Sequence, residues 1–122
     1  MKRRARATGP SAAVVAQVCA RDGRCVRCGY EPTGARGYDW SLHHRLRRSQ
    51  GGTNTPENLV VVCGHGTAGC HWEVHAGPAL SRHFGWLVRR GDDPDTVPVF
   101  IHDVGWVLLT GDGQREPVEE VA

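Results

Sequence analysis

Eight side chains of two kinds supply the chemistry that this sequence can be expected to perform. Four are thiols, which come as a close C-x-x-C pair and a wider pair, and four are imidazoles, two adjacent and two spaced four apart. Thiolates in a tetrahedral set favour zinc, whereas imidazoles bind several divalent metals. We therefore expect two separate metal sites, drawn from Cys25, Cys28, Cys63 and Cys70 and from His43, His44, His71 and His75.

The cysteine spacing predicts a structural zinc site. Two thiolates in a C-x-x-C turn can bind one zinc ion, and a second pair is needed to close the tetrahedron. Cys63 and Cys70 are the reasonable donors, and the glycine-rich segment between them can fold back as a loop. His65, within that loop, is an alternative for one of the four ligands. Disulfides are disfavoured because the number of cysteines, five, is odd and the paired spacing suits a metal better.

The histidine spacing predicts a second site made by a strand and a helix. His71 and His75 are four residues apart, so a helix would direct both at one ion. His43 and His44 end a run, residues 38–42, that is typical of a strand, where neighbouring side chains face opposite sides. One of these two can therefore share the ion with the helical pair while the other does something else. Spacing alone leaves open which one.

Taken together, these residues resemble the HNH endonucleases, which use the ββα-metal fold. The resemblance covers roughly residues 25–75 and is carried by DWSLHHRLRRSQGGTNTPENLVVVCGHGTAGCHWEVH. It implies that His44 is the general base and that Asn58, just before the second strand, orders the loop and so helps to hold the base. It also implies a catalytic divalent ion bound by His43, His71 and His75.

Phosphodiester hydrolysis suits these residue types. Imidazole titrates near neutral pH, so His44 is able to take a proton from water under physiological conditions. A divalent ion held by three imidazoles would act as a Lewis acid and charge sink. The ligand types leave Mg²⁺, Mn²⁺, Ni²⁺ and Zn²⁺ open for this position. The sequence therefore predicts a metal-dependent DNA endonuclease with an additional structural Zn²⁺.

Charge is divided unevenly along the chain and predicts a nucleic-acid partner. Residues 1–50 hold eleven Lys and Arg against three Asp and Glu, a balance of +8, whereas residues 51–122 hold four against ten, a balance of −6. A basic half joined to a nuclease site suggests contact with the DNA backbone. Guanidinium groups bind phosphate well, and three of them follow the histidine pair at once. We expect DNA contacts from Arg45, Arg47 and Arg48.

These elements predict an α+β fold: a small ββα-metal HNH core with a four-cysteine zinc site, an N-terminal helix and a C-terminal β-hairpin extension. Ser11 can cap a helix through about Arg21, with Cys19 in its apolar stripe. Two runs, 97–101 and 106–109, predict the hairpin, and residues 86–90 a further short strand. The expected organisation is a basic flexible arm at 1–10, the HNH nuclease domain with its helix at 11–85, the β extension at 86–113 and an acidic tail at 114–122.

The segment CGHGTAGCH and the C-terminal pattern look like the small HNH proteins of actinobacterial phages and prophages. That resemblance implies a role in DNA packaging, with phage terminase subunits as partners, in the cytoplasm of a bacterial host cell. No run is long and apolar enough to predict a membrane span. The alternative is a zinc-stabilised DNA-binding or terminase-accessory module without nuclease activity. Such a module would have no need of the histidine and asparagine set, which favours the nuclease.

Overall fold

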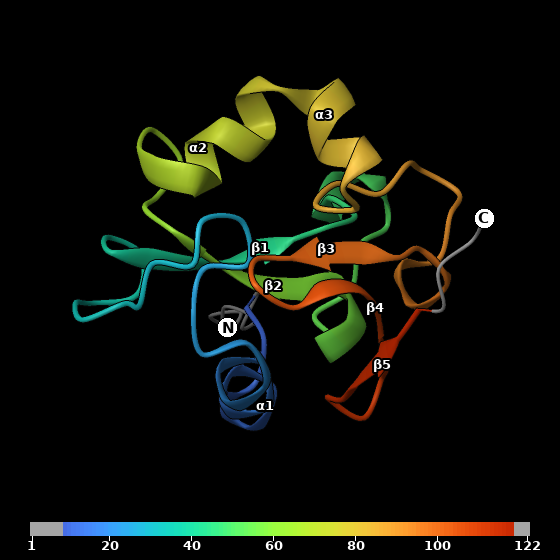
Figure 1. Ribbon diagram of the computed structural model, residues 1–122, viewed down its shortest axis with the longest axis horizontal. Coiled ribbons are helices and arrows are strands. Elements are labelled where there is room, and N and C mark those ends of the chain that lie inside the picture. The colour runs from blue at the N-terminus through green and yellow to red at the C-terminus, as the bar shows by residue number, and fades with distance from the viewer. Residues whose placement is uncertain (1–8, 119–122) are drawn as a thin grey trace, which may run out of the picture.

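The computed structural model describes residues 9–118, and its helices lie on two sides of the strands (Figure 1). Helix α1 is on one side, and α2 and α3 are on the other. Within residues 9–118, no helix is long and apolar enough to cross a lipid bilayer. The elements are α1 Ala12–Asp22, β1 Trp40–His44, β2 Leu59–Cys63, α2 Gly69–Ala76, α3 Pro78–His83, β3 Val99–Ile101, β4 Gly105–Leu109 and β5 Arg115–Pro117, with 3-10 turns at Arg48–Gln50, Pro56–Asn58 and Pro94–Thr96.

Helix α1 begins and ends where the sequence predicts. The Ser11 hydroxyl accepts a hydrogen bond from the backbone N–H of Val14 at 3.2 Å, which satisfies one of the free donors of the first turn. Gly23 ends the helix in the left-handed conformation, with a φ of 64°. The apolar side of α1, with Val18 at its centre, packs against Leu42 of β1 and against β2. The predicted N-terminal helix is thereby confirmed.

Strands β1 and β2 form an antiparallel pair in which His43 lies opposite Val60. Apolar residues fill β2 without a break because both faces of this pair are covered. Leu59 and Val61 join the core cluster under α1, whereas Val60 and Val62 join the cluster that contains α2. His43 shares the side of Val60, so the fold directs this imidazole toward α2. The predicted α+β class is confirmed.

The C-terminal strands belong to the same core as α2. Val99 and Ile101 of β3 and Val107 of β4 are buried in one cluster with Val60 and Val74. The predicted hairpin is present as antiparallel β3 and β4. A third strand, β5, pairs with β4 and comes from the segment that the sequence presents as an acidic tail. The C-terminal sheet is thus packed into the core and contributes to the surroundings of the site.

The strand predicted at residues 86–90 is wrong. This segment is irregular, because its backbone donors are used by other elements. The N–H groups of Trp86 and Leu87 bond to the carbonyl of Ser81 at 2.9 and 3.1 Å, and the N–H of Val88 bonds to the carbonyl of Arg45 at 2.8 Å. Its apolar side chains are nevertheless buried, which explains the strand-like sequence pattern. The basic stretch at 1–8 and the last residues, 119–122, lie outside the described residues.

Candidate functional site

Three imidazoles meet between β1 and α2. His43 comes from β1, and His71 and His75 lie one turn apart on α2. Their candidate ligand nitrogens are all within 4.8 Å of one another. The ring centroids are 5.7 Å apart for His43 and His71, 5.0 Å for His43 and His75, and 5.3 Å for the helical pair. The three histidines expected to share one ion are therefore grouped around one point.

The surroundings of this imidazole cluster favour neutral rings with available lone pairs. Burial lowers the pKa of His43 to about 3, and burial is also the main cause that lowers the pKa of His71 and of His75. Nε2 of His43 donates to the carbonyl oxygen of Trp86 at 2.6 Å, which leaves Nδ1 as its ligand atom. Nδ1 of His71 is buried without a hydrogen-bond partner, an arrangement that a bound ion would satisfy. This donor set fits a divalent metal ion.

His44 lies beside the imidazole cluster and is held separately from it. Its Nε2 is 2.7 Å from Oδ1 of Asn54. An amide oxygen can only accept, so Nε2 carries the proton and Nδ1 is left as an acceptor. His44 is close enough to His71 that its charge is among the causes, after burial, that lower the pKa of that neighbour. The arrangement places a potential proton acceptor next to a potential metal site.

Asn58 does not bond to His44 but holds the loop between the strands. Its side chain is 0% exposed. Oδ1 accepts from the N–H of Leu46 at 2.7 Å, and Nδ2 donates to the carbonyls of Leu46 at 3.0 Å and Thr53 at 2.9 Å. Both ends of the loop are thereby fixed, and the residue that follows Thr53 is Asn54, the partner of His44. This geometry agrees with the loop-ordering role that the resemblance implies for Asn58.

Asn54 is a residue of the site that the sequence did not single out. It lies in a polar, glycine-containing loop, and asparagine is common in such loops for reasons unrelated to function. The contact with His44 depends on the path of the loop, which Asn58 determines from beneath. In the sequence, Asn54 is marked only by lying ten residues after His44, and this separation does not indicate a contact until the fold is known.

The four predicted cysteine ligands also come together. Their sulfur atoms all lie within 4.8 Å of one another, and Sγ of Cys28 is 3.7 Å from Sγ of Cys63. Two thiolates on one zinc ion, each bonded at about 2.3 Å in a tetrahedral set, would be separated by nearly that distance. All five cysteines of the chain are free, so the disulfide alternative does not hold in this structure. The cluster, Cys25, Cys28, Cys63 and Cys70, is compatible with a zinc site.

A tight turn closes the wide gap between Cys63 and Cys70. The backbones of His65 and Ala68 exchange two hydrogen bonds, at 2.9 and 3.1 Å. Gly64 has a φ of 81°, and a Cβ there would lie 2.1 Å from the carbonyl oxygen of Ala68, so only glycine fits. The ring of His65 stacks on Tyr38 and is not part of the cysteine cluster. The alternative in which His65 replaces one cysteine is therefore not supported.

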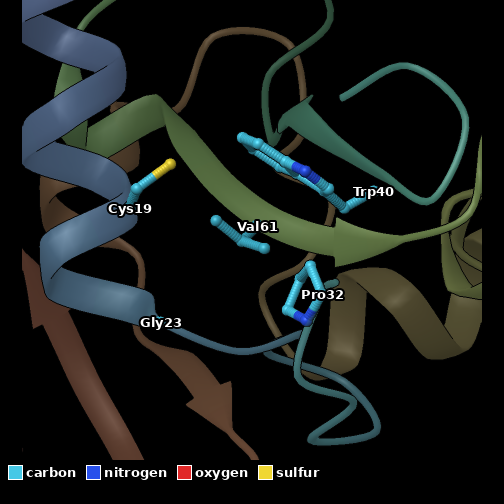
Figure 2. A pocket seen from close by; sticks show the side chains of 5 residues that line it. All are labelled: Cys19, Gly23, Pro32, Trp40 and Val61. Atoms are coloured by element: carbon cyan, nitrogen blue, oxygen red, sulfur yellow. The ribbon is translucent and has the colours of Figure 1, made fainter. Parts of the chain in front are cut away.

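Cys19 lies elsewhere and points into a small apolar pocket (Figure 2). The side chain projects from α1 toward Val61 of β2. Burial is the main cause that raises the pKa of the Cys19 thiol, which favours the neutral thiol over the thiolate. It packs with the core cluster under α1, as its position in the apolar stripe predicts. The pocket has a volume of about 190 Å³ and is lined by Cys19, Gly23, Pro32, Trp40 and Val61.

One arginine and one tryptophan connect the two clusters. Nη1 of Arg27 is 3.4 Å from Sγ of Cys70, and its guanidinium lies 5.6 Å from the centre of the Trp86 ring. A hydrogen bond from Cys70 lowers the pKa of Cys25 to about 4, so the cluster favours at least one thiolate, and Arg27 offsets negative charge there. The carbonyl of the same Trp86 accepts from His43. Trp86 therefore contacts the surroundings of both sites.

The three arginines expected to contact DNA have different surroundings. Arg47 and Arg48 are exposed, whereas Arg45 is 0% exposed. The guanidinium of Arg45 donates to four backbone carbonyls, those of Gly85, Glu57, Pro94 and Val97, at 2.7–2.9 Å. Burial lowers the pKa of Arg45 to about 9, so the group still carries its charge at neutral pH. The expectation of a phosphate contact is corrected for Arg45: its donors are used inside the protein, where they join the loop before β2 to the segment before β3.

Comparison with known proteins supports the sequence resemblance. The model of the HNH endonuclease family matches residues 25–77, the segment that contains both metal clusters. No match was found among functionally curated proteins, and none among solved structures. The matched segment suggests a metal-dependent nuclease, for which DNA is the implied substrate.

Proposed function

We propose that this protein is a metal-dependent DNA endonuclease and that the imidazole cluster with His44 is its active site. The observation that carries the proposal is the convergence of His43, His71 and His75, with a separately held His44 beside them. The match of residues 25–77 to the HNH endonucleases supports the same reaction class. A structural module would gain nothing from a buried, unpartnered imidazole nitrogen on His71.

In the proposed reaction, His44 is the general base. Its Nδ1 accepts a proton from the attacking water, and Asn54 keeps the ring oriented through the Nε2–H group. His43, His71 and His75 would hold a divalent ion, which would supply Lewis acidity toward the phosphate and the departing oxygen. Mg²⁺, Mn²⁺, Ni²⁺ and Zn²⁺ all remain candidates for that position, whereas the four thiolates would hold a structural Zn²⁺.

Arg47 and Arg48 remain proposed contacts of the DNA backbone, because both are exposed and follow the histidine pair by a few residues. The resemblance of CGHGTAGCH to small HNH proteins of phages supports a further proposal, that the reaction serves DNA packaging beside a terminase in a bacterial host cell. The alternative of a DNA-binding accessory module without nuclease activity makes a different prediction in the assay that follows.

The test is plasmid cleavage by wild-type protein and by His44→Ala across Mg²⁺, Mn²⁺, Ni²⁺ and Zn²⁺, with EDTA as the metal-free control. We expect His44→Ala to cleave on the order of 10² to 10⁴ times more slowly, because removal of a general base commonly has that effect. DNA binding and zinc content should stay at the wild-type level. His83→Ala, at an exposed histidine on α3, is the matched control and should cleave normally. A wild-type protein that binds DNA but cleaves it with none of the four ions would favour the accessory module.

A further inference from the structure

A cleft of about 510 Å³ carries four arginines on its walls. Three of them come from the C-terminal half of the chain, which is acidic overall, so the charge balance of the sequence conceals them. Buried apolar residues of the irregular segment after α3 and the first residue of α3 also line it. We call this feature the arginine cleft, and the residues that define it are Arg47, Arg82, Arg89, Arg90, Pro78 and Leu87.

Among residues 9–118, no acidic side chain forms an ion pair with an arginine of the cleft. In the part of the chain that the structure describes, the ion pairs are Arg21 with Asp22, Arg24 with Glu31 and His102 with Asp103. None of these pairs involves an arginine of the cleft. All four guanidinium-bearing residues there are exposed. The acidic residues that follow Arg90 in the chain do not line this cleft. Four like charges that line one hollow, with no ion-pair partner in the described part of the chain, favour an anionic ligand.

The arginine cleft lies next to the imidazole cluster. Arg47 lies three residues after His44, the last residue of β1, so this arginine is close along the chain to the histidine pair. Helix α3, which supplies Arg82, begins two residues after the end of α2. The segment that supplies Arg89 is tied to the site by the bond between His43 and the carbonyl of Trp86. The walls of the cleft are therefore continuous with the elements that hold the imidazoles.

We propose that the arginine cleft binds the phosphates of a DNA strand that extends from the imidazole site on the α3 side. The proposal rests on the nuclease function proposed above and names the surface by which the substrate is held. Guanidinium groups pair with phosphate oxygens, and apolar residues such as Pro78 and Leu87 offer a surface for the sugars between them. The arrangement accounts for a strand of evenly spaced phosphates better than for one small anion, because the charges come from three separate segments.

The test compares two double variants that each remove two positive charges. Arg82→Gln/Arg89→Gln changes the cleft, whereas Arg24→Gln/Arg36→Gln changes exposed arginines outside it. Binding of a duplex DNA of about 20 base pairs is measured in EDTA by fluorescence anisotropy over a series of salt concentrations, so that the DNA stays intact. Each phosphate contact contributes about 0.9 to the slope of log affinity against log salt. The cleft variant should lose roughly 1.8 from that slope and bind about tenfold more weakly near physiological salt.

The control variant should keep the wild-type slope, and circular dichroism and zinc content should be normal for both proteins. Equal losses from the two variants would mean that the cleft has no special role and would overturn the proposal. A loss confined to a duplex RNA of the same length would overturn it as well, because the ligand would then not be DNA. Plasmid cleavage by wild-type protein separates the two levels of inference. Cleavage together with an unaffected cleft variant would refute only the cleft, whereas binding through the cleft without any cleavage would refute only the nuclease.

Discussion

The imidazole cluster and the thiolate cluster differ in how far the protein prepares them without a metal. His43 is buried, hydrogen-bonded to the carbonyl of Trp86 and carried by a strand that is covered on both faces. Cys28, in contrast, is exposed, and its sulfur lies against that of another thiol, Cys63. Packing can therefore hold His43 without an ion, whereas Cys28 depends on the thiolate cluster and would be fixed by an ion bound there. This contrast suggests that one site serves chemistry and the other serves stability.

The imidazole cluster nevertheless depends on the thiolate cluster, because both take ligands from α2. Cys70 and His71 are neighbours near the start of that helix. A metal bound by the thiolates would fix this end of α2 and so determine where His71 and His75 project. The reverse dependence is weaker, since loss of the imidazole ligands leaves the buried Val74 and the cysteines of α2 and β2 in place. The comparison therefore predicts that thiolate variants lose both fold and activity, and that imidazole variants lose activity alone.

The largest effect is expected from Cys63→Ser. Zinc binding to such sites is worth on the order of 10 kcal/mol and is coupled to folding, which is comparable with the roughly 5–15 kcal/mol that stabilises a typical domain. The variant should lose zinc and most of its cooperative thermal transition by circular dichroism. Cys19→Ser is the matched control, because this thiol is outside the cluster, and it should keep both. A zinc-free Cys63→Ser protein with a normal melting curve would break the comparison.

His71→Ala should separate activity from stability. The half-buried ring is expected to be a ligand rather than a core residue, so its removal should leave the melting curve close to wild type and one equivalent of zinc bound. Cleavage should fall by more than about a hundredfold, because metal sites are sensitive even to changes around their ligands. Glu73→Ala, at an exposed position of the same helix, provides the comparison and should remain active. If His71→Ala unfolds as readily as Cys63→Ser, packing alone does not hold the imidazole cluster in its geometry.

Arg45→Met should show how much the fold depends on the buried hydrogen bonds of this arginine. The guanidinium joins the carbonyls of the loop before β2, of the residue before Trp86 and of the segment before β3, and the substitution would leave these carbonyls without their donors. A buried acceptor left without its donor typically costs about 1–3 kcal/mol, so the loss of four such bonds should cost several kcal/mol. Urea unfolding should report this loss, whereas the exposed Arg47→Met should stay within roughly 0.5 kcal/mol of wild type. Equal stability of the two variants would show that the Arg45 network is dispensable.

Local signals were enough to predict much of the fold and the members of both clusters. A serine cap and a glycine stop delimit α1. The histidine pair follows the run that forms β1, Asn58 precedes β2, and the four-residue spacing of His71 and His75 indicates α2. Each of these signals acts within a few residues. The role of Arg45 could not be read in the same way. An arginine beside other arginines suggests solvent, and only the path of residues 85–97 around it shows that its donors face inward.

The C-terminal half was harder to predict for a related reason. The apolar residues from 86 to 88 have the composition of a strand, but their N–H groups bond to Ser81 and to Arg45 instead of to a neighbouring strand. The apolar composition of this segment indicates that its side chains are buried, but it does not indicate which carbonyls accept from its backbone N–H groups. The same limit applies to the arginine cleft, whose charges are distributed over three segments and become one surface only after folding.

The smallest effect, and the finest test of the comparison, concerns the two asparagines. Asn58 supports the loop, and Asn54 orients His44 from that loop. Asn54→Leu should lower the single-turnover cleavage rate by roughly tenfold to a hundredfold, since small errors in orientation have effects of that size. Its urea stability should change by no more than about 1 kcal/mol, the typical net value of one hydrogen bond. Asn58→Ala, which removes three buried hydrogen bonds, should instead destabilise the protein by about 2–4 kcal/mol.

Asn54→Asp distinguishes orientation from a general disturbance of the loop. Aspartate keeps an oxygen that accepts from Nε2 of His44, so this variant should retain most of the rate that Asn54→Leu loses. If Asn54 only stabilised the fold, the cleavage rate would fall in proportion to the loss of stability. A plot of cleavage rate against unfolding free energy would then place Asn54→Leu, Asn54→Asp and Asn58→Ala on one line. The orientation role predicts that Asn54→Leu lies well below that line, because its defect is in the proton acceptor and not in the fold. A normal cleavage rate for Asn54→Leu would show that His44 is held by other contacts.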